Sequence, residues 1–471
     1  MFGAVAWSVV DKTGQQLIQF IFGIILARLL MPAEFGMIGV LMILVSLSTV
    51  LVDGGFGQAI IRKQNTSQVD YNSVFYLNLV ISSFFYLVLF FSAPWIAGYF
   101  GNHDLIRVSR ILFTAVLFYA VYIIQTSLLI KRLQYQSFAV INITGFLVSG
   151  AGAATAAAFG LGIWALVVQQ LGYHVIRFIM LPFYVKWRPT LSFSTEFIRE
   201  VWPFSFKLMQ TSVLNVLFNQ IYTLILVRFF TIRDVGFYYQ ANKLTDPING
   251  TAMQVIHNSA FPLLSMIAPD KPRVQNVYSQ LAKSISLLFF PVNAVLIVTA
   301  YPLLVTILSE KWTASVPLFQ LLVTANFFTP LYFLNITLLN SQGESRRTFH
   351  IELLKKTVIL ISIPVLFHFG IMALLAGFLI ACWVSFAYSL KQVSTILNVD
   401  LLKQLKGLFP FFLFGIVLGL LISLLNLTDT SLLVKLILQV LSAVILFITG
   451  AFTLFREHLN KILELLPYPK K

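Results

Sequence analysis

The sequence predicts an all-α polytopic membrane protein of about 14 transmembrane helices, built as two parallel six-helix lobes plus two C-terminal helices. Three observations predict this class. The composition is 58% hydrophobic and only 10% charged. Apolar runs of about 20 residues, the length that crosses a bilayer as a helix, follow one another along the chain. A charged turn also occurs twice, at Arg28 and again at Arg228, an offset of 228 − 28 = 200 residues.

The apolar runs predict the spans in order. The first half holds 3–29, 35–60, 72–98, 106–130, 137–159 and 161–184, the second half holds 203–230, 235–267, 276–308, 315–340, 348–369 and 371–396, and two more follow at 407–426 and 431–455. These runs divide the chain into an N-terminal lobe (1–185), a linker (186–202), a C-terminal lobe (203–396) and a final helix pair with its tail (397–471). In the linker, Ser194, Thr195 and Glu196 predict a helix start, which we interpret as an interfacial helix.

The repeated turn reads IILARLLMPAEFGM at 24–37 and LILVRFFTIRDVGF at 224–237. An arginine, an acid and a glycine match at equal spacings (Arg28 and Arg228, Glu34 and Asp234, Gly36 and Gly236). Because six spans, an even number, precede the second copy, both copies run in the same direction through the membrane. We expect the two arginines to hold each turn to its acidic residue.

Basic residues gather in alternate loops, which predicts that both termini are cytoplasmic by the positive-inside rule. The predicted cytoplasmic loops hold Arg62, Lys63, Lys131, Arg132, Lys186, Arg188, Arg199, Lys271, Arg273, Arg346, Arg347, Lys391, Lys403, Lys406, Arg456, Lys461, Lys470 and Lys471. The opposite loops hold only Arg107, Arg110, Arg233, Lys311 and Lys435, besides the repeated arginines.

Several classes of function are excluded. The net charge of +15 lies in short loops, where it orients the protein and meets anionic lipid, so we expect no nucleic-acid partner. The single cysteine, Cys382, lies in an apolar span, and neither a metal-binding cluster nor a catalytic motif is present. The first span carries Asp11 and Lys12 and lacks a small-residue cleavage site, which argues against a cleavable signal peptide. We therefore expect no catalytic residue, no metal and no cofactor.

Polar side chains enter the membrane mainly in the first, seventh and eighth spans. A charge at the bilayer centre costs about 2.5–3.5 kcal/mol on insertion scales and faces a cavity or a partner. The candidates are Asp11, Lys12 and Gln19 in the first span, Lys207, Asn215 and Asn219 in the seventh, and Tyr239, Asn242, Lys243, Asp246, Asn249 and His257 in the eighth. Those of the eighth span recur at helical spacing and form one stripe, which faces either water or the partner half.

A structural interpretation stays open for several of these residues. Asp11 beside Lys12, and Asp246 one turn after Lys243, also fit ion pairs that only lock helices together. Lys207 lies near a cytoplasmic helix end, where a lysine can extend to the interface. Arg177 sits deeper in the sixth span, below His174, and is a better candidate for a cavity.

The chain resembles a known family at three places: AWSVVDKTGQQLIQF at 6–20, ARLLMPAEFGM at 27–37, and VDGGFGQAIIRK at 52–63. These segments resemble the polysaccharide transporter family of Wzx-type flippases, and most closely its colanic acid exporter-like subgroup. The family belongs to the superfamily that also holds the multidrug MATE exporters and the MurJ lipid II flippase. The resemblance implies a bacterial inner-membrane protein with two six-helix lobes.

The resemblance also implies a function. It implies that an undecaprenyl-diphosphate oligosaccharide enters between the lobes, which rock to release it outside for O-antigen, capsule or exopolysaccharide assembly. Membrane lipids and the polymerase or glycosyltransferase machinery are the partners implied. Cations suit the diphosphate, and amides and tyrosines suit the sugars. The residues offered for binding are Lys12, Lys243, Lys207, Arg177, Gln19, Asn215, Asn219, Tyr239, Asn242 and Asn249, and those offered for ion coupling are Asp11, Asp246 and His257.

Three alternatives remain at this stage. A drug or cation antiporter is expected to hold acids in an apolar cavity, whereas lysines accompany the acids here. A lipid II flippase of the same superfamily differs only in substrate. A polysaccharide polymerase or ligase needs a long extracytoplasmic catalytic loop, and the predicted loops there run to about ten residues or fewer.

Overall fold

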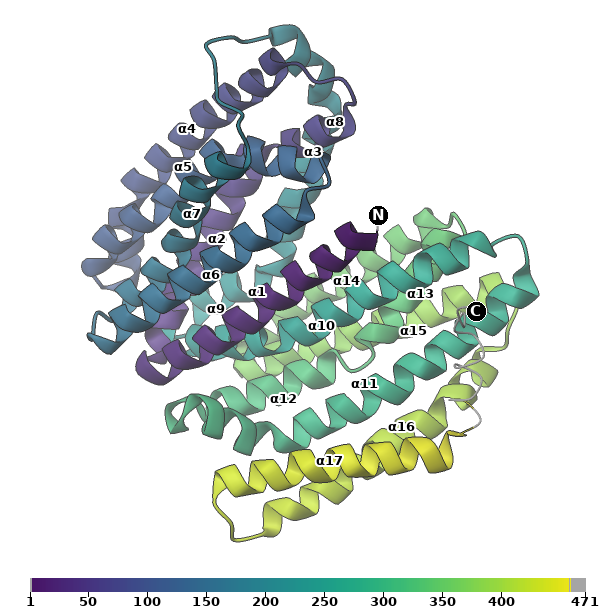
Figure 1. Cartoon of the computed structure of the whole chain (residues 1–471). Coiled ribbons are helices and arrows are strands. Elements are labelled where there is room, and N and C mark those ends of the chain that lie inside the picture. Colours follow the sequence, from purple (N-terminus) through teal and green to yellow (C-terminus); the bar gives the residue numbers. More distant parts are fainter. Residues whose placement is uncertain (1, 457, 459–471) are drawn as a thin grey trace. The chain divides into compact units, whose positions relative to one another are not determined.

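The structure is a computed structural model that describes residues 2–456 and 458, and these form helices joined by short turns, without a β-strand (Figure 1). The first half comprises α1 (Phe2–Leu29), α2 (Pro32–Asp53), α3 (Phe56–Arg62), α4 (Gln68–Phe100), α5 (Asp104–Lys131), α6 (Tyr135–Ala158) and α7 (Ile163–Tyr184). The rest comprises α8 (Thr195–Asn219), α9 (Ile221–Phe229), α10 (Ile232–Met266), α11 (Lys271–Leu308), α12 (Ser315–Ala325), α13 (Thr329–Ser341), α14 (Ser345–Leu366), α15 (Ile371–Leu397), α16 (Leu401–Ser423) and α17 (Leu432–Leu454), with 3₁₀ turns at Glu310–Trp312, Phe367–Phe369 and Leu424–Leu427.

Every predicted span corresponds to one helix or to one broken helix pair, which confirms the all-helical fold class. Within the described residues, ten helices or helix pairs are long and apolar enough to cross a membrane, and α8 with α9, bent by 47°, makes an eleventh. The polar helices α1, α10 and α14 are not among these. The count of 14 spans therefore stays a prediction. Lys461, Lys470 and Lys471 of the predicted cytoplasmic set lie outside the described residues.

The second predicted span, 35–60, is broken into α2 and α3. Gly54 and Gly55 both adopt left-handed backbone conformations, with φ of 53° and 78°, that a residue with a Cβ rarely adopts. At Gly55 a Cβ would also lie 2.6 Å from the backbone oxygen of Ser205, so α8 approaches the turn closely. After this break α3 packs against α8.

The chain divides into two compact units, Met1–Tyr239 and Gln240–Lys471. In the first unit α1 packs on α6, α6 on α7 and α4 on α5, while α8 packs on α2, α3 and α4. In the second unit α11 packs on α16 and α14 on α15. The segment predicted as an interfacial helix forms the first turns of α8, which continues without a break to Asn219. The lobe boundaries predicted from sequence, at 185 and 203, remain a prediction.

Both copies of the repeated turn lie in the first unit and touch each other. A Cβ on Gly36 would overlap the backbone oxygen of Ile232, and a Cβ on Gly236 would overlap the backbone oxygen of Pro32. Two glycines at equivalent places in the repeat therefore let the starts of α2 and α10 meet backbone to backbone.

The acids of the repeat serve as helix caps. Glu34 Oε2 accepts a 2.7 Å hydrogen bond from the backbone N–H of Met31, and Asp234 Oδ2 accepts bonds of 3.2 and 2.7 Å from the N–H and hydroxyl of Thr231. Each acid thus satisfies backbone donors at the start of the following helix, where a negative charge is favoured.

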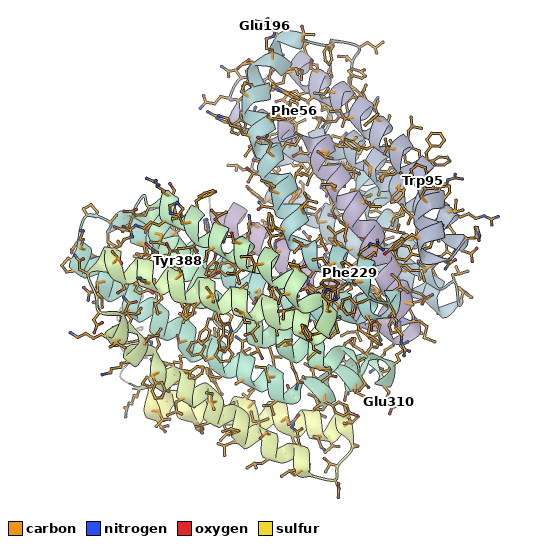
Figure 2. All side chains as sticks on the ribbon, turned by 180° about the vertical axis from the view of Figure 1, so that it is seen from behind. Phe56, Trp95, Glu196, Phe229, Glu310 and Tyr388 are labelled. Carbon is orange, nitrogen blue, oxygen red and sulfur yellow. The ribbon has the colours of Figure 1, made fainter. Side chains whose placement is uncertain are left out.

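Large apolar side chains face outward along the helices, as expected for a surface in contact with lipid tails. On α4 the exposed set includes Val80, Phe84, Phe91 and Trp95, and the last of these is 82% exposed. Figure 2 shows Trp95 at the outer edge of its helix. This surface agrees with a multi-pass membrane protein.

Candidate functional site

Asp11 on α1 lies at the start of a buried polar network inside the first unit. Its side chain is 8% exposed, and Oδ1 accepts hydrogen bonds from Gln15 Nε2 at 2.7 Å and from Asn142 Nδ2 at 3.1 Å. The partners of Asp11 are therefore amides of α1 and α6. Among the described residues no ion pair joins it to Lys12, whose side chain is exposed.

The network continues from α6 to α7 and α5. Tyr173 donates its hydroxyl hydrogen to Asn142 Oδ1 at 3.2 Å and accepts a 3.1 Å bond from Arg177 Nη1. The other terminal nitrogen, Nη2, donates to Thr126 Oγ1 at 3.0 Å, and the guanidinium lies 4.6 Å from the ring centre of Tyr122. Asp11 and Arg177 are thus connected through two intervening side chains.

Arg177 is a buried cation, 8% exposed and enclosed by aromatic rings. Tyr173 and Phe138 lie 5.4 and 5.8 Å from its guanidinium carbon, and Nε has no hydrogen-bond partner among the described residues. Ring faces stabilise a cation electrostatically where water is absent. In this conformation the Arg177 side chain therefore lies inside the first unit and does not reach the exposed faces of the helices around it.

Other predicted residues of the first unit lie on accessible helix faces. Lys12 is exposed on α1, and Gln19 is half-buried two turns further along. On α8, Lys207, Asn215 and Asn219 are all exposed, at spacings of eight and four residues that place them on one side of the helix. Tyr239 is half-buried, with its ring packed against Gly39 of α2. The structure thus separates an accessible polar set from the buried network.

The predicted residues of the second unit all belong to α10. Asn242 Nδ2 donates a 3.1 Å hydrogen bond to Asp246 Oδ2, so the partner of Asp246 is an amide one turn away. No ion pair joins Asp246 to Lys243 in the described part of the chain, and Lys243 and Asn249 are half-buried. His257 is exposed, and its ring stacks on Phe261 with centroids 5.5 Å apart.

Sequence reasoning missed the residues that connect the network. Asn142 and Tyr173 carry the link between Asp11 and Arg177, and Tyr122 bonds His174 Nδ1 at 2.8 Å through its hydroxyl. The available signal was an amide at 142 inside an otherwise apolar span. Helical periodicity does not say which neighbouring helix such an amide meets, and so it does not identify the partner.

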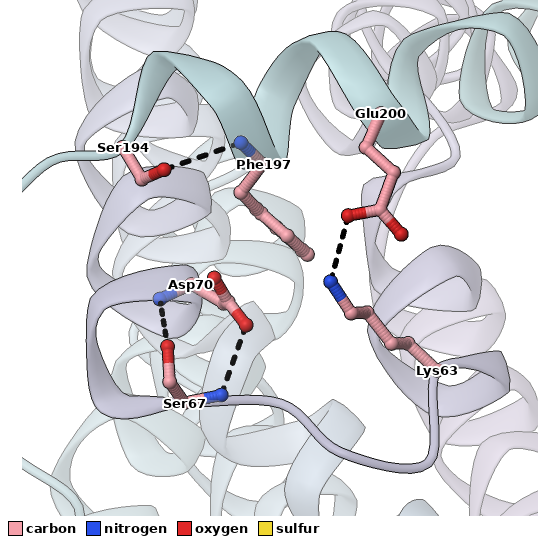
Figure 3. Close-up of polar contacts among 6 residues, drawn as sticks. All are labelled: Lys63, Ser67, Asp70, Ser194, Phe197 and Glu200. Atoms are coloured by element: carbon pink, nitrogen blue, oxygen red, sulfur yellow. Dashed lines mark hydrogen bonds and ion pairs between the residues drawn. The ribbon is translucent and has the colours of Figure 1, made fainter.

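A second polar cluster holds the start of α8 against α3 and α4, and we call it the α8 clasp (Figure 3). Lys63 Nζ lies 2.8 Å from Glu200 Oε2 and 4.7 Å from the ring centre of Phe197. The hydrogen bond to Glu200 raises the pKa of Lys63 above its ordinary value. Ser194 accepts from the N–H of Phe197 at 3.2 Å, as expected for a helix N-cap.

The α8 clasp extends along the linker. Asn72 on α4 donates to the hydroxyls of Thr190 and Ser192, at 2.6 and 2.7 Å, and Ser73 accepts a 2.7 Å bond from the N–H of Ser194. These α4 side chains are therefore hydrogen-bond partners of the linker. The linker is therefore attached to the first unit along most of its length.

No group of three or more His, Cys, Asp or Glu side chains in the described residues could hold a metal ion. The carboxylates named above each accept a hydrogen bond, from amides at Asp11 and Asp246 and from the Lys63 ammonium at Glu200. Within these residues the polar chemistry consists of ammonium, guanidinium, amide and hydroxyl groups. Such groups bind phosphates and sugars noncovalently.

Comparison with known proteins identifies the family and the relatives that this chain resembles. A family model described as polysaccharide biosynthesis protein matches residues 25–317, more than half of the chain. The succinoglycan biosynthesis transport protein ExoT of Rhizobium meliloti is 25% identical over 327 residues, covering 69% of this chain and 66% of ExoT. The lipopolysaccharide biosynthesis protein WzxC of Escherichia coli is 23% identical over 304 residues, covering 63% and 61%. The chain therefore spans slightly less than two thirds of these relatives.

Solved structures share the fold. The lipid II flippase MurJ, in an inward closed conformation, aligns with a TM-score of 0.73 and 13% identity over 96% of this chain and 99% of its own. An inward-facing multidrug resistance MATE transporter aligns with a TM-score of 0.60 and 14% identity over 82% and 95%. These likenesses confirm the predicted MurJ- and MATE-like helical architecture. The match over residues 25–317 shows that this chain belongs to the family of polysaccharide biosynthesis proteins.

Proposed function

We propose that this protein flips an undecaprenyl-diphosphate-linked oligosaccharide across the bacterial inner membrane by alternating access. The oligosaccharide then serves the assembly of a surface polysaccharide such as O-antigen, capsule or exopolysaccharide. The main support for the proposal is the family match over residues 25–317. The chain also combines helices apolar enough to cross a membrane with helices that carry polar and cationic side chains. Relatives named for succinoglycan transport and for lipopolysaccharide biosynthesis support the same substrate class.

The accessible polar set of the first unit and the half-buried polar residues of α10 both suit such a substrate. Lys12, Lys207 and Lys243 offer ammonium groups to a diphosphate, and a charge-assisted hydrogen bond contributes about 1.5–3 kcal/mol. Amide and phenol groups offer hydrogen bonds and a ring face to sugars (Gln19, Asn215, Asn219, Tyr239, Asn242 and Asn249). Arg177 acts indirectly in this proposal, by holding the buried network that ends at Asp11.

Asp11, Asp246 and His257 are the groups we propose for ion coupling. Asp11 accepts two amide hydrogen bonds in a buried site, so loss of its negative charge would weaken both bonds at once. That change would loosen α1 from α6, which is the kind of local switch that ion-coupled transport requires. Protons and sodium ions both fit this role.

The chain is proposed to be a transporter without a covalent step. Between Phe2 and Leu454 the longest segment outside a helix is 185–194, which joins α7 to α8 and is bound along α4. That leaves no described loop in which a polymerase or ligase domain would fit. We also propose that both termini face the cytoplasm, where the substrate is made, and that the polymerase machinery receives the flipped lipid.

A deletion strain tests the function. We expect a diphosphate-linked oligosaccharide to accumulate in the cytoplasmic leaflet while surface polysaccharide is lost, with both effects reversed by the wild-type gene. If the lipid still reached the outer leaflet and sensitivity to cationic drugs rose instead, the protein would be an antiporter. Accumulation of lipid II with normal surface glycan would identify a lipid II flippase. Reporter fusions at each terminus test the orientation.

A further inference from the structure

Two adjoining pockets lie in the second unit, the first between α11, α16 and the end of α15, and the second between α11, α16 and the end of α17. The first has a volume of about 230 Å³ and is lined by Tyr278, Ser279, Lys283, Lys403 and Gln404, among others. The second has a volume of about 550 Å³ and is lined by Gln280, Lys283, Lys406, Arg456 and His458, among others. Lys283 and Gly407 line both pockets, so the two are neighbours along one groove.

The groove is cationic. Lys283, Lys403, Lys406 and Arg456 contribute four formal positive charges, and none of the described lining residues is acidic. At the start of α16 the nearest acid is Asp400, which caps the N–H of Leu402 at 3.2 Å. Glu457, between Arg456 and His458 in the sequence, lies outside the described residues. An anion is therefore the complementary ligand.

The groove also holds polar atoms that have no partner. Both side-chain atoms of Gln404, Oε1 and Nε2, are buried without a hydrogen-bond partner among the described residues, and so is Oε1 of Gln280. Buried amide atoms are normally hydrogen-bonded, and leaving one unsatisfied is unfavourable. A ligand for this site should therefore carry acceptors for Nε2 and the lysines, and hydroxyl donors for the two amide oxygens.

The groove opens beside apolar surface. On α16 the side chains of Leu402, Leu405 and Phe409 are 62%, 43% and 58% exposed, in the same turns as Lys403 and Lys406. Exposed leucine and phenylalanine beside basic residues are typical of a membrane surface where headgroups meet acyl chains. By the distribution of loop charge, this end of the bundle faces the cytoplasm.

We propose that this groove binds the phosphoglycerol headgroup of an anionic phospholipid, with its acyl chains along α16. The phosphate is the acceptor for Lys283, Lys403 and Gln404 Nε2, and the glycerol hydroxyls are donors to Gln404 Oε1. Phosphatidylglycerol carries both groups, whereas phosphatidylcholine lacks the hydroxyls and adds a cation. The site is made from α11, α16 and α17, which carry none of the residues proposed for the transported substrate, so it stands apart from the proposed function.

The position of Lys283 offers a way to block the groove without changing charge. A Cβ on Gly407 would lie 3.8 Å from Lys283 Cε, so the lysine stem passes directly over this glycine. A leucine at 407 would occupy the space between the two pockets. We therefore expect Gly407→Leu to exclude the headgroup while all four cations remain.

The test uses the full chain, purified in a nonionic detergent and titrated with phosphatidylglycerol or phosphatidylcholine under native mass spectrometry. We expect binding of phosphatidylglycerol at least about fivefold tighter than phosphatidylcholine, and a loss of about fivefold for each lysine removed in Lys283→Gln with Lys403→Gln. Gly407→Leu should lose the preference as well. Lys271→Gln with Lys391→Gln removes the same charge from exposed positions outside both pockets and should retain it.

Several results would overturn the proposal. Equal binding of both lipids, or equal loss in the control pair, would show that only bulk charge matters. Stabilisation by inorganic phosphate or pyrophosphate to the same extent as by lipid would identify a free anion as the ligand. Unchanged lipid preference in both groove variants would exclude this site. Thermal unfolding in lipid-free detergent identifies a variant that fails to fold, and the other groove variant then decides the question.

Discussion

Asn142 Nδ2 lies 3.1 Å from Asp11 Oδ1, although the two residues are 131 positions apart in the chain. The same asparagine accepts a hydrogen bond from Tyr173 with its oxygen, so one amide satisfies a carboxylate on one side and a phenol on the other. Its two ends hold α1 and α7 to α6. This single side chain therefore connects the only buried carboxylate of the described α1 residues to the buried arginine of α7.

Replacing this amide should destabilise the first unit. Asn142→Ala leaves Asp11 and Tyr173 each short of one partner, and an unsatisfied buried polar group costs about 1–3 kcal/mol. We expect a lower midpoint of thermal unfolding in detergent. Ser149→Ala, on the same helix, removes only a 3.4 Å bond to the backbone oxygen of Phe146 and should change the midpoint much less. Equal effects of the two substitutions would contradict a special role for Asn142.

At the contact between the two repeated turns, Gly36 and Gly236 should not tolerate replacement by a residue that has a side chain. Gly36→Ala and Gly236→Ala each place a methyl group onto a backbone carbonyl oxygen of the other turn, and forced overlap of this kind costs about 1–3 kcal/mol or more. We expect each variant to express at a lower level and to unfold at lower temperature. Gly98→Ala, in a helix and with nothing within 4 Å, should be neutral or stabilising by up to about 1 kcal/mol. A stable Gly36→Ala protein would show that the turns do not meet as described.

The ion pair of the α8 clasp should depend on pH in a defined direction. Glu200 raises the pKa of Lys63 above its ordinary 10.5, so the contribution of the pair is complete below that pH and is lost as pH rises through the raised pKa. Both groups are partly exposed, so the effect on stability stays below about 1 kcal/mol. We expect Glu200→Gln to lower the pKa of Lys63 in NMR spectra of ¹³C-methylated lysines, with the resonance assigned by Lys63→Arg. An unchanged titration in Glu200→Gln would show that the pair does not form.

Lys12 and Lys243 should matter for export rather than for folding. Lys12→Ala and Lys243→Ala each remove a cation proposed for the diphosphate, and losing one charge-assisted hydrogen bond weakens binding by about ten- to a hundredfold. We expect reduced surface polysaccharide at unchanged protein level. Lys435→Ala serves as a control, because Lys435 bonds the backbone oxygen of Asn426 at 3.0 Å near the start of α17. Normal export in both test variants would assign Lys12 and Lys243 a structural role.

The sequence by itself determined the helical class, the approximate ends of the helices, the repeated turn and the identity of the polar residues within the spans. These follow from local rules, because apolar length and helix caps are properties of short stretches of residues. The break at Gly54 and Gly55 inside the predicted span 35–60 was not predicted. Only the tertiary structure decided which side chains these polar residues and glycines contact. It replaced the two suspected ion pairs with amide contacts, at Asn142 for Asp11 and at Asn242 for Asp246, and it brought Gly36 against Gly236. Helical periodicity identifies the polar face of a helix, whereas only the packing of helices distant in sequence determines which side chain meets it.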